Sequence, residues 1–170
     1  MADKIKNVLF LCTGNSCRSI IAEALLNHLG KSRFRGFSAG SHPAGQVNRR
    51  ALAALGRRGI DAPGARSKNW DGFAAAGAPV MDMVITVCDN AAGEVCPIWP
   101  GHPATGHWGI PDPAEFEGGD AATDAVFDET CRRLESRIRK FLALPLDGLD
   151  AAALRRRLNE IGESADAAGR

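Results

Sequence analysis

The spacing of hydrophobic residues alternates along the chain between short apolar runs and helical periodicity. The apolar runs predict strands at residues 7–12, 34–39 and 80–87, and a shorter strand at 106–110. Apolar residues that recur every three or four positions predict helices at 18–29, 48–58 and 120–142, and a short helix at 67–76. Residues 90–106 are rich in glycine and proline, which is typical of a long loop. Strands that alternate with helices indicate an α/β domain with a parallel sheet.

The same spacing identifies the side chains that two of these helices should bury. In the helix at 48–58 we expect Ala51, Leu52 and Leu55 to face inward. The helix at 120–142 carries a stripe of apolar residues that we expect to face the core: Val126, Cys131, Leu134, Ile138, Phe141 and Leu142.

The composition changes after Pro145. Residues 150–161 predict a helix with Asp150 as its N-cap. This helix has few apolar residues to bury, namely Leu149, Leu154, Leu158 and Ile161. The following segment, GESADAAGR, predicts a frayed tail. We therefore expect one domain at residues 1–144 and an appended helix with a tail at 145–170.

Composition and charge exclude several classes of protein. The chain has 170 residues, of which 45% are hydrophobic, so it suits one domain with a sizeable core. A net charge of +1 gives no field that would favour nucleic acid or a membrane surface. The apolar run near the N-terminus is too short for a signal peptide or a membrane span, so we expect a cytoplasmic protein. Five cysteines in a reducing compartment are more often catalytic, redox-active or metal-binding than a disulfide framework.

The first predicted strand ends at a cysteine, Cys12, and leads into the segment CTGNSCRS. Ligands of parallel α/β sheets bind at the carboxyl ends of the strands, so Cys12 lies where a ligand-binding site is expected. Gly14 allows tight curvature, and the loop opens the helix that begins at Arg18. Backbone N–H groups at such a helix start converge on an anion, and a guanidinium adds a planar fork of donors. We expect the cradle to comprise residues Thr13, Gly14, Asn15, Ser16, Cys17, Arg18 and Ser19.

The positive surroundings of this cradle favour a thiolate over a thiol at Cys12, and Ser19 is placed to donate a hydrogen bond to the sulfur. The segment therefore predicts a nucleophilic thiolate in a cradle for an oxyanion such as phosphate or arsenate. The alternative is that Cys12 is inert, as most buried cysteines are. A C-x5-R pattern often arises by chance, but it rarely does so between a buried strand and the start of a helix, so we favour the cradle.

The segment CTGNSCRS resembles the signature loop of the low-molecular-weight tyrosine phosphatase superfamily. It is more similar still to the arsenate reductases built on that fold, which share the run LCTGNSCRS almost letter for letter. Further motifs match at residues 22–23, 38–40, 85–89, 96–100 and 107–114, so the resemblance covers about residues 4–142. It implies a three-layer αβα fold with a central parallel sheet of about four strands, to which the helix at 150–161 is appended.

The resemblance assigns chemical roles to five residues. Cys12 is the nucleophile, Arg18 binds the oxyanion, and Asp112 of the Asp-Pro motif is the general acid. After Cys12 forms an adduct with arsenate, Cys88 attacks the Cys12 sulfur and a Cys12–Cys88 disulfide forms. Cys96 then attacks Cys88. The resulting Cys88–Cys96 disulfide is reduced by thioredoxin as external reductant. The implied reaction is the reduction of arsenate to arsenite, with phosphate or sulfate as competing oxyanions and with no bound cofactor.

The resemblance also implies a group that supports the loop. Relatives of this kind hold a potassium ion with groups that correspond to Asn15, Glu23, Ser38 and an acidic residue near 67–68. The chain has Lys68 there, so we expect no potassium, with the ammonium holding Asn15 and Glu23 in place. A solvated surface lysine is the other interpretation of Lys68.

The residues leave two alternative functions open, a phosphatase and a zinc module. A phosphatase acting on phosphomonoesters needs only Cys12, Arg18 and Asp112; against it, Ala114 stands where related phosphatases carry a tyrosine, and the chain has no tyrosine. A zinc module built from Cys88, Cys96 and two histidines would have wider spacing than a usual structural site. The electron donor stays open between thioredoxin and a low-molecular-weight thiol. The residues assign no role to the helix at 150–161.

Overall fold

A parallel four-stranded sheet forms the centre of the molecule in the computed structural model, which describes residues 4–88 and 99–164. The strands are β1 (Lys6–Cys12), β2 (Phe34–Gly40), β3 (Met83–Thr86) and β4 (Ala104–His107), in the order β2-β1-β3-β4. All three pairings are parallel. The carboxyl ends of the strands therefore meet at one edge, where Cys12 closes β1.

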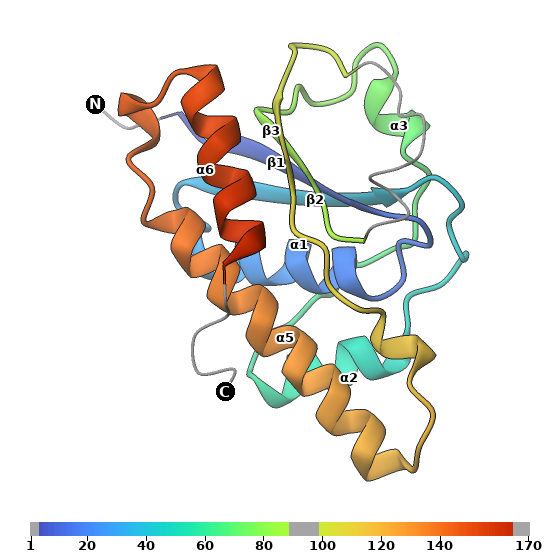
Figure 1. Cartoon of the computed structure of the whole chain (residues 1–170). Coiled ribbons are helices and arrows are strands. Elements are labelled where there is room, and N and C mark those ends of the chain that lie inside the picture. The colour runs from blue at the N-terminus through green and yellow to red at the C-terminus, as the bar shows by residue number, and fades with distance from the viewer. Residues whose placement is uncertain (1–3, 89–98, 165–170) are drawn as a thin grey trace.

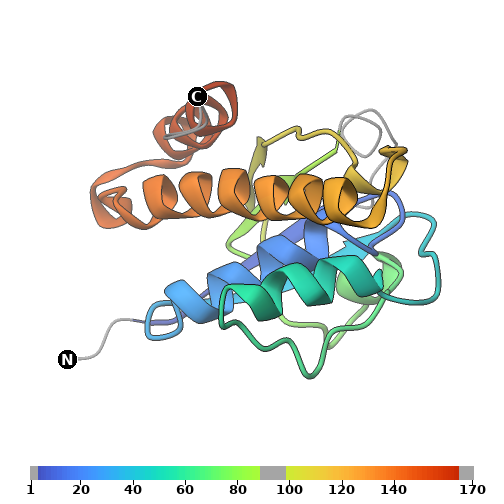
Figure 2. The ribbon, with the colours of Figure 1, turned by 90° about the horizontal axis from the view of Figure 1, so that it is seen from below.

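Helices cover both faces of this sheet. They are α1 (Arg18–Leu29), α2 (Arg49–Arg57), α3 (Asp71–Ala74), α5 (Asp120–Leu142) and α6 (Ala151–Glu163), with 3-10 turns η1 (Pro113–Glu115) and η2 (Leu146–Gly148). In Figure 1, α1, α2 and α5 lie on one side of the sheet and α3 lies on the other. Figure 2 shows α1, α2 and α5 side by side, as their mutual contacts require. The predicted α/β fold with a parallel four-stranded sheet and a C-terminal helix is confirmed.

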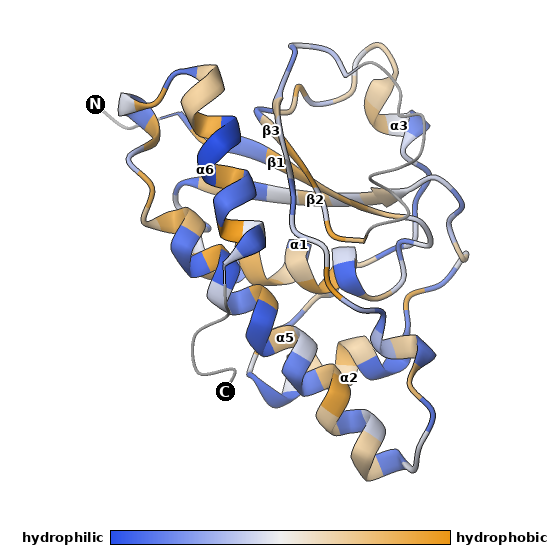
Figure 3. Ribbon diagram, in the orientation of Figure 1, coloured by the Kyte–Doolittle hydropathy of each residue, from blue (hydrophilic) through white to orange (hydrophobic). Residues whose placement is uncertain are grey.

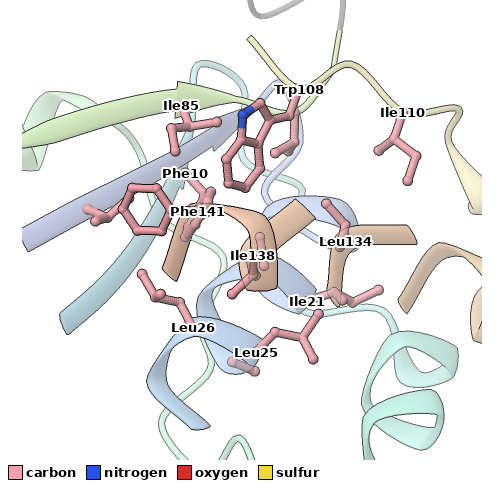
Figure 4. Packing of buried hydrophobic residues seen from close by; sticks show 14 of the residues in the cluster. Phe10, Ile21, Leu25, Leu26, Ile85, Trp108, Ile110, Leu134, Ile138 and Phe141 are labelled. Atoms are coloured by element: carbon pink, nitrogen blue, oxygen red, sulfur yellow. The ribbon is translucent and has the colours of Figure 1, made fainter. Parts of the chain in front are cut away.

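Alternate side chains of β1 lie in two different hydrophobic cores, because successive side chains of a strand point to opposite faces of the sheet. Val8 and Phe10 face the larger core, which the helices α1, α2, α5 and α6 complete. Figure 4 shows this core, in which Phe10, Trp108 and Phe141 pack together among aliphatic side chains. Leu9 and Leu11 face a smaller core on the α3 side. A strand buried on both faces reads as a continuous apolar run, which is how the sequence presents it.

Helices α2 and α6 each begin at a residue whose side chain caps the first turn. The Asn48 side chain accepts hydrogen bonds from two backbone N–H groups of the first turn of α2, and the Asp150 side chain accepts one from Ala153. Figure 3 shows hydrophilic and hydrophobic bands alternating along α5 and α6, as expected for helices that bury one face. None of the helices within residues 4–88 and 99–164 combines the length and the apolar character that a membrane crossing needs.

Two predicted core positions are wrong. Leu52 is 38% exposed, because Ala51, Ala54 and Leu55 form the buried face of α2. On α5 Val126 is only half-buried, and the neighbouring Phe127, which is 1% exposed, takes the core position instead. Phe127 lies four residues before Cys131 and so shares its face, whereas a residue five positions away does not.

The predicted helix at 67–76 is also too long, since only Asp71–Ala74 is helical. The backbone before it pairs with β2 instead: Gly40 donates to the Lys68 carbonyl, and Trp70 donates to the Gly40 carbonyl. These hydrogen bonds take the groups that a helix would need.

The last two strands differ from their predicted ranges. Strand β3 begins at Met83 rather than at Val80, which is 54% exposed. Strand β4 spans Ala104–His107 instead of 106–110, because its partner β3 offers only the four residues Met83–Thr86 for pairing.

Candidate active site

Cys12 lies at the carboxyl end of β1, where the chain turns directly into α1. Its sulfur is 2.9 Å from the Ser19 hydroxyl and accepts a hydrogen bond of 3.2 Å from the Asn15 backbone N–H. Cys17 is the N-cap of α1 and makes no side-chain cap, so the N–H groups of the first helical turn point to the same space without an intrahelical acceptor. Donors and the helix dipole thus surround a sulfur that is itself nearly buried.

The fully buried Asn15 organises this loop. Its backbone has φ of +46°, a left-handed conformation that asparagine tolerates better than most residues. Its side-chain oxygen accepts from the Lys68 N–H at 2.7 Å, which turns its amide nitrogen toward Ser19 Oγ at 2.8 Å. Because Ser19 Oγ accepts from Asn15, its own proton is directed to the sulfur of Cys12. The network therefore stabilises negative charge on that sulfur.

The loop is also tied down through its carbonyl groups. The Thr13 carbonyl accepts from His42, and the Gly14 carbonyl accepts from Ala44 and from the Ser67 hydroxyl. At the end of β2, a Cβ atom on Gly40 would lie 2.4 Å from the Thr13 oxygen. Only glycine allows the two backbones to approach this closely, which gives a physical reason for the motif at residues 38–40.

Glu23, Ser38 and Lys68 form a polar cluster behind the loop, in which Ser38 is buried and the other two side chains are half-buried. Ser38 donates to Glu23 at 2.5 Å, and the Lys68 ammonium lies 3.5 Å from Ser38 Oγ and 3.8 Å from Glu23 Oε1. Burial raises the pKa of Glu23, against the opposing effects of the Ser38 hydrogen bond and the Lys68 charge. Burial lowers the pKa of Lys68, and Glu23 opposes that shift. Since the Lys68 N–H also holds Asn15, the cluster connects directly to the thiol loop.

Arg18 connects the thiol loop to the loop that follows β4. One guanidinium nitrogen donates to the Ile110 carbonyl at 2.9 Å, and another lies 3.6 Å from an oxygen of Asp112. The second oxygen of Asp112 accepts from the Ala114 N–H, so Asp112 caps the turn η1 and its carboxylate is held in place. Arg18 and Asp112 therefore face each other across the site, with 15% and 27% of their side chains exposed.

Cys88 completes the same site from the end of β3. It lines a pocket of about 250 Å³ together with Arg18, Asp112 and Glu115. Its sulfur is 3.8 Å from the hydroxyl of Thr13, the residue that follows Cys12. The structure thus brings Cys12, Arg18, Asp112 and Cys88 to one edge of the sheet. The fifth residue of the predicted site, Cys96, lies outside the described residues.

The remaining described cysteines differ from Cys12 in their surroundings. Cys17 points into the larger core, and burial raises the pKa of its thiol to about 12. Cys131 is buried on α5, where burial raises the pKa to about 11. Both are neutral thiols at physiological pH, so any part of Cys17 in the cradle belongs to its backbone.

A family model described as low molecular weight phosphotyrosine protein phosphatase matches residues 7–158. The chain belongs to this family. Among curated relatives, the arsenate reductase of Bacillus licheniformis is 39% identical over 137 residues, which is 80% of this chain and 94% of that protein. The prediction of an enzyme similar to the arsenate reductases of this family is confirmed.

Solved structures give the same grouping. A structure of an arsenate reductase in the phosphate binding state has a TM-score of 0.61 and 26% identity, and the match covers 82% of this chain and 98% of that one. A thioredoxin-dependent arsenate reductase from Corynebacterium glutamicum has a TM-score of 0.54 and 30% identity, with coverage of 82% and 64%. The family match extends to residue 158, which lies within α6.

The polar cluster of this family member does not fit a potassium ion. An ion among Glu23, Ser38 and Asn15 would meet the Lys68 ammonium, a like charge that already lies within 4 Å of the first two. Within residues 4–88 and 99–164, no group of three His, Cys, Asp or Glu side chains is placed to hold a metal. The zinc alternative depends on Cys96, which falls outside those ranges.

Some residues that shape the site were not singled out from the sequence. The Ile110 carbonyl anchors Arg18, and the buried Arg137 of α5 donates to the Trp108 and Gly109 carbonyls. Ile110 lies inside the motif at 107–114, but a backbone acceptor leaves no mark on residue identity. Arg137 is one of several arginines on α5, and only its 3% exposure distinguishes it.

Proposed function

We propose that the chain reduces arsenate to arsenite with Cys12 as nucleophile and Cys88 and Cys96 as resolving cysteines. The observation that carries this proposal is a second cysteine at the site: Cys88 lines the pocket that Arg18 and Asp112 share. Hydrolysis of a phosphate ester needs one thiol, whereas reduction of As(V) to As(III) needs a second thiol to accept the oxidation as a disulfide.

In the first step the Cys12 thiolate attacks arsenic. The Arg18 fork and the N–H groups of the first turn of α1 bind the arsenate oxygens and the charge that develops on them. One arsenate hydroxyl accepts a proton from Asp112 and leaves as water, because hydroxide is a poor leaving group. The product is an adduct with a bond between the Cys12 sulfur and arsenic.

In the second step the Cys88 thiolate attacks the Cys12 sulfur. The electron pair of the sulfur–arsenic bond stays on arsenic, which leaves as arsenite, and a Cys12–Cys88 disulfide forms. The Cys96 thiolate then attacks the Cys88 sulfur and releases the Cys12 thiolate. The Cys88–Cys96 disulfide passes its oxidation to an external dithiol, for which we propose thioredoxin. The thioredoxin-dependent relative from Corynebacterium glutamicum supports this choice of reductant.

Lys68 supplies the positive charge behind the thiol loop in this proposal. Its ammonium interacts with Glu23 and Ser38, and its backbone N–H orients Asn15. The enzyme then needs neither a resident metal nor a bound cofactor for the reaction, and phosphate and sulfate compete with arsenate for the cradle.

A phosphatase reaction is the second candidate, and the family assignment favours it. Cys12, Arg18 and Asp112 are the groups that it requires. Ala114, which follows Asp112 and Pro113, provides no aromatic wall for an aryl ester, so we expect this activity to be weak.

The test is arsenate-dependent NADPH oxidation coupled through thioredoxin and thioredoxin reductase, with hydrolysis of p-nitrophenyl phosphate measured beside it. We expect Cys12→Ser, Cys88→Ser and Cys96→Ser each to stop arsenate turnover, and only Cys12→Ser to stop hydrolysis. Cys131→Ser is the matched control, because this cysteine is buried on α5 away from the site.

Normal arsenate turnover in Cys88→Ser or Cys96→Ser would overturn the relay. Hydrolysis of the ester without any arsenate turnover in the wild type would make the phosphatase the function. Turnover with glutathione and glutaredoxin but not with thioredoxin would leave the chemistry at Cys12 in place and change the reductant.

A further inference from the structure

The loop that carries Asp112 is held by two helices from the far end of the sequence. On α5, the buried Arg137 donates to the Trp108 carbonyl at 2.9 Å and to the Gly109 carbonyl at 3.1 Å. On α6, the Asn159 side chain accepts from the His107 backbone N–H at 2.9 Å, and the Leu158 carbonyl accepts from the Trp108 indole at 2.9 Å. Three successive residues before Ile110 are thus bonded to these helices.

The contact between α6 and β4 is unusually close. A Cβ atom on Gly162 would lie 2.0 Å from the His107 carbonyl oxygen, and one on Gly106 would lie 2.7 Å from Leu158 Cβ. Two glycines, one on each element, therefore allow the helix to approach the strand. Among the described residues β4 is the edge strand of the sheet, and Asn159 pairs with an N–H group on the side of β4 that faces away from β3.

This contact leads directly to the catalytic groups of the proposed reaction. The Ile110 carbonyl accepts from Arg18, and Asp112 follows two residues later. On the opposite side the segment is bonded to the end of β3 and to the residue that follows it, since the Trp108 N–H donates to the Thr86 carbonyl and the Ile110 N–H donates to the Val87 carbonyl. A shift of α6 would therefore move the segment 107–110, and with it both Asp112 and the anchor of Arg18. Figure 4 shows Trp108 deep in the core beside Ile85 and Phe10, where it fixes the segment from within.

We infer that α6 is a positioning element for the acid loop, with Asn159 and Gly162 as positioning residues. The inference rests on the proposed roles of Cys12 and Asp112. Misplacement of a reacting group by about 1 Å can lower a rate by about 10²-fold, so a helix that fixes this loop affects the chemistry without touching substrate. Its effect should fall on proton donation by Asp112 and less on the attack by Cys12.

The experiment compares kcat/KM for two esters, phenyl phosphate and p-nitrophenyl phosphate. The leaving group of phenyl phosphate is phenolate, which is more basic than the p-nitrophenolate that leaves from the other ester. Its departure therefore depends more on a proton from Asp112. In Asn159→Ala and Gly162→Ala we expect kcat/KM for phenyl phosphate to fall about tenfold more than that for p-nitrophenyl phosphate. A loss of folded enzyme would lower both values equally, so their ratio reports position and not stability.

Matched controls separate the contact from general effects. Asn159→Asp keeps the oxygen that accepts from His107 and should restore the ratio of the wild type. Gly56→Ala makes the same change within α2, where a Cβ atom would meet nothing within 4 Å, and should leave the ratio unchanged. Arg156→Ala changes an exposed residue of α6 itself and should also leave it unchanged.

An unchanged ratio in both Asn159→Ala and Gly162→Ala would overturn the inference, provided that Asp112→Asn changes it. If Asp112→Asn also leaves the ratio unchanged, the proposed role of Asp112 fails instead. Single-turnover formation of arsenite is measured in parallel, so the inference stays testable if the esters turn over too slowly. There we expect the two α6 variants to lose about tenfold in rate and the three controls to match the wild type.

Discussion

The two halves of the candidate active site are built in different ways. In the thiol half the groups that contact the sulfur are neighbours in sequence, since Cys12, Asn15 and Ser19 lie within one strand–loop–helix turn and bond to one another. Lys68 and Gly40 only support this turn from outside. The acid half consists of one short segment before Asp112 that depends on α5 and α6, which lie far away in the sequence. A local half can be recognised from a motif. A half that depends on distant elements can be damaged by substitutions that touch no reacting atom.

Removing the acid should separate the two halves most strongly. In Asp112→Asn we expect kcat/KM for phenyl phosphate to fall about 10³-fold, because the leaving group loses its proton donor. Alkylation of Cys12 by iodoacetamide should keep its wild-type rate, since the hydrogen bonds to the sulfur come from Asn15 and Ser19. A parallel loss of alkylation would show that the halves do not act separately.

Breaking the thiol half should give the reverse pattern. In Asn15→Ala we expect turnover to fall about 10²-fold and alkylation of Cys12 to slow, because the Ser19 hydroxyl loses its orientation. The loss of a buried partner for the Lys68 N–H should also lower the free energy of unfolding by about 1–3 kcal/mol.

Asn27→Ala is the control for that variant, because Asn27 ties α1 to β2 through two hydrogen bonds with Gly36 away from the sulfur. It should lower stability in urea denaturation and leave alkylation unchanged. Slower alkylation in both variants would mean that general loosening, and not the Ser19 orientation, controls the thiol.

A smaller effect is expected where the thiol loop meets β2. In Gly40→Ala the new methyl group would lie 2.4 Å from the Thr13 oxygen, so the loop must shift. We expect about a tenfold loss of turnover and a loss of about 1–3 kcal/mol in the free energy of unfolding. Gly64→Ala, where nothing lies within 4 Å, is the control. Equal kinetics for the two variants would contradict the role given to the close approach.

The smallest effect should appear in the pH dependence of stability around Glu23 and Lys68. Burial raises the pKa of Glu23 above its ordinary value of 4.5, so the folded state binds this proton more tightly than the unfolded chain does. The resulting contribution to the free energy of unfolding is complete below about pH 4.5 and is lost as the pH rises through the folded pKa. Lys68 opposes that loss while it is charged.

In Lys68→Met we therefore expect a steeper fall in stability as the pH rises above 4.5, which reaches about 1–2 kcal/mol relative to the wild type. Urea denaturation across this pH range measures it. The double variant Lys68→Met with Glu23→Gln should lose the additional slope, because the group that titrates is gone. A slope that persists in the double variant would assign the effect to another group.

Much of the thiol half could be predicted because its signals are local. The bounds of α1 and α5, and the placement of Cys12 at the end of a strand, agree with the structure. The errors at Leu52 and Val126 arose where two apolar residues competed for one helix face, since spacing alone does not show which face the neighbouring helix covers. The predicted helix at 67–76 failed because the backbone of Lys68 and Trp70 bonds to β2, a partner that no local pattern shows.

The sequence by itself determined the parallel α/β organisation, the thiol loop with Arg18, and the Asp-Pro motif at Asp112 to which we assign the acid. These depend on periodicity and on residue types at fixed short spacings, which are properties of the chain read along its length. Only the tertiary structure decided which distant groups hold the acid loop, because the donors from Arg137 and the contacts of Asn159 and Gly162 exist only once α5 and α6 pack against β4. Backbone acceptors and close approaches are set by that packing, and the residues involved carry no local signal of it.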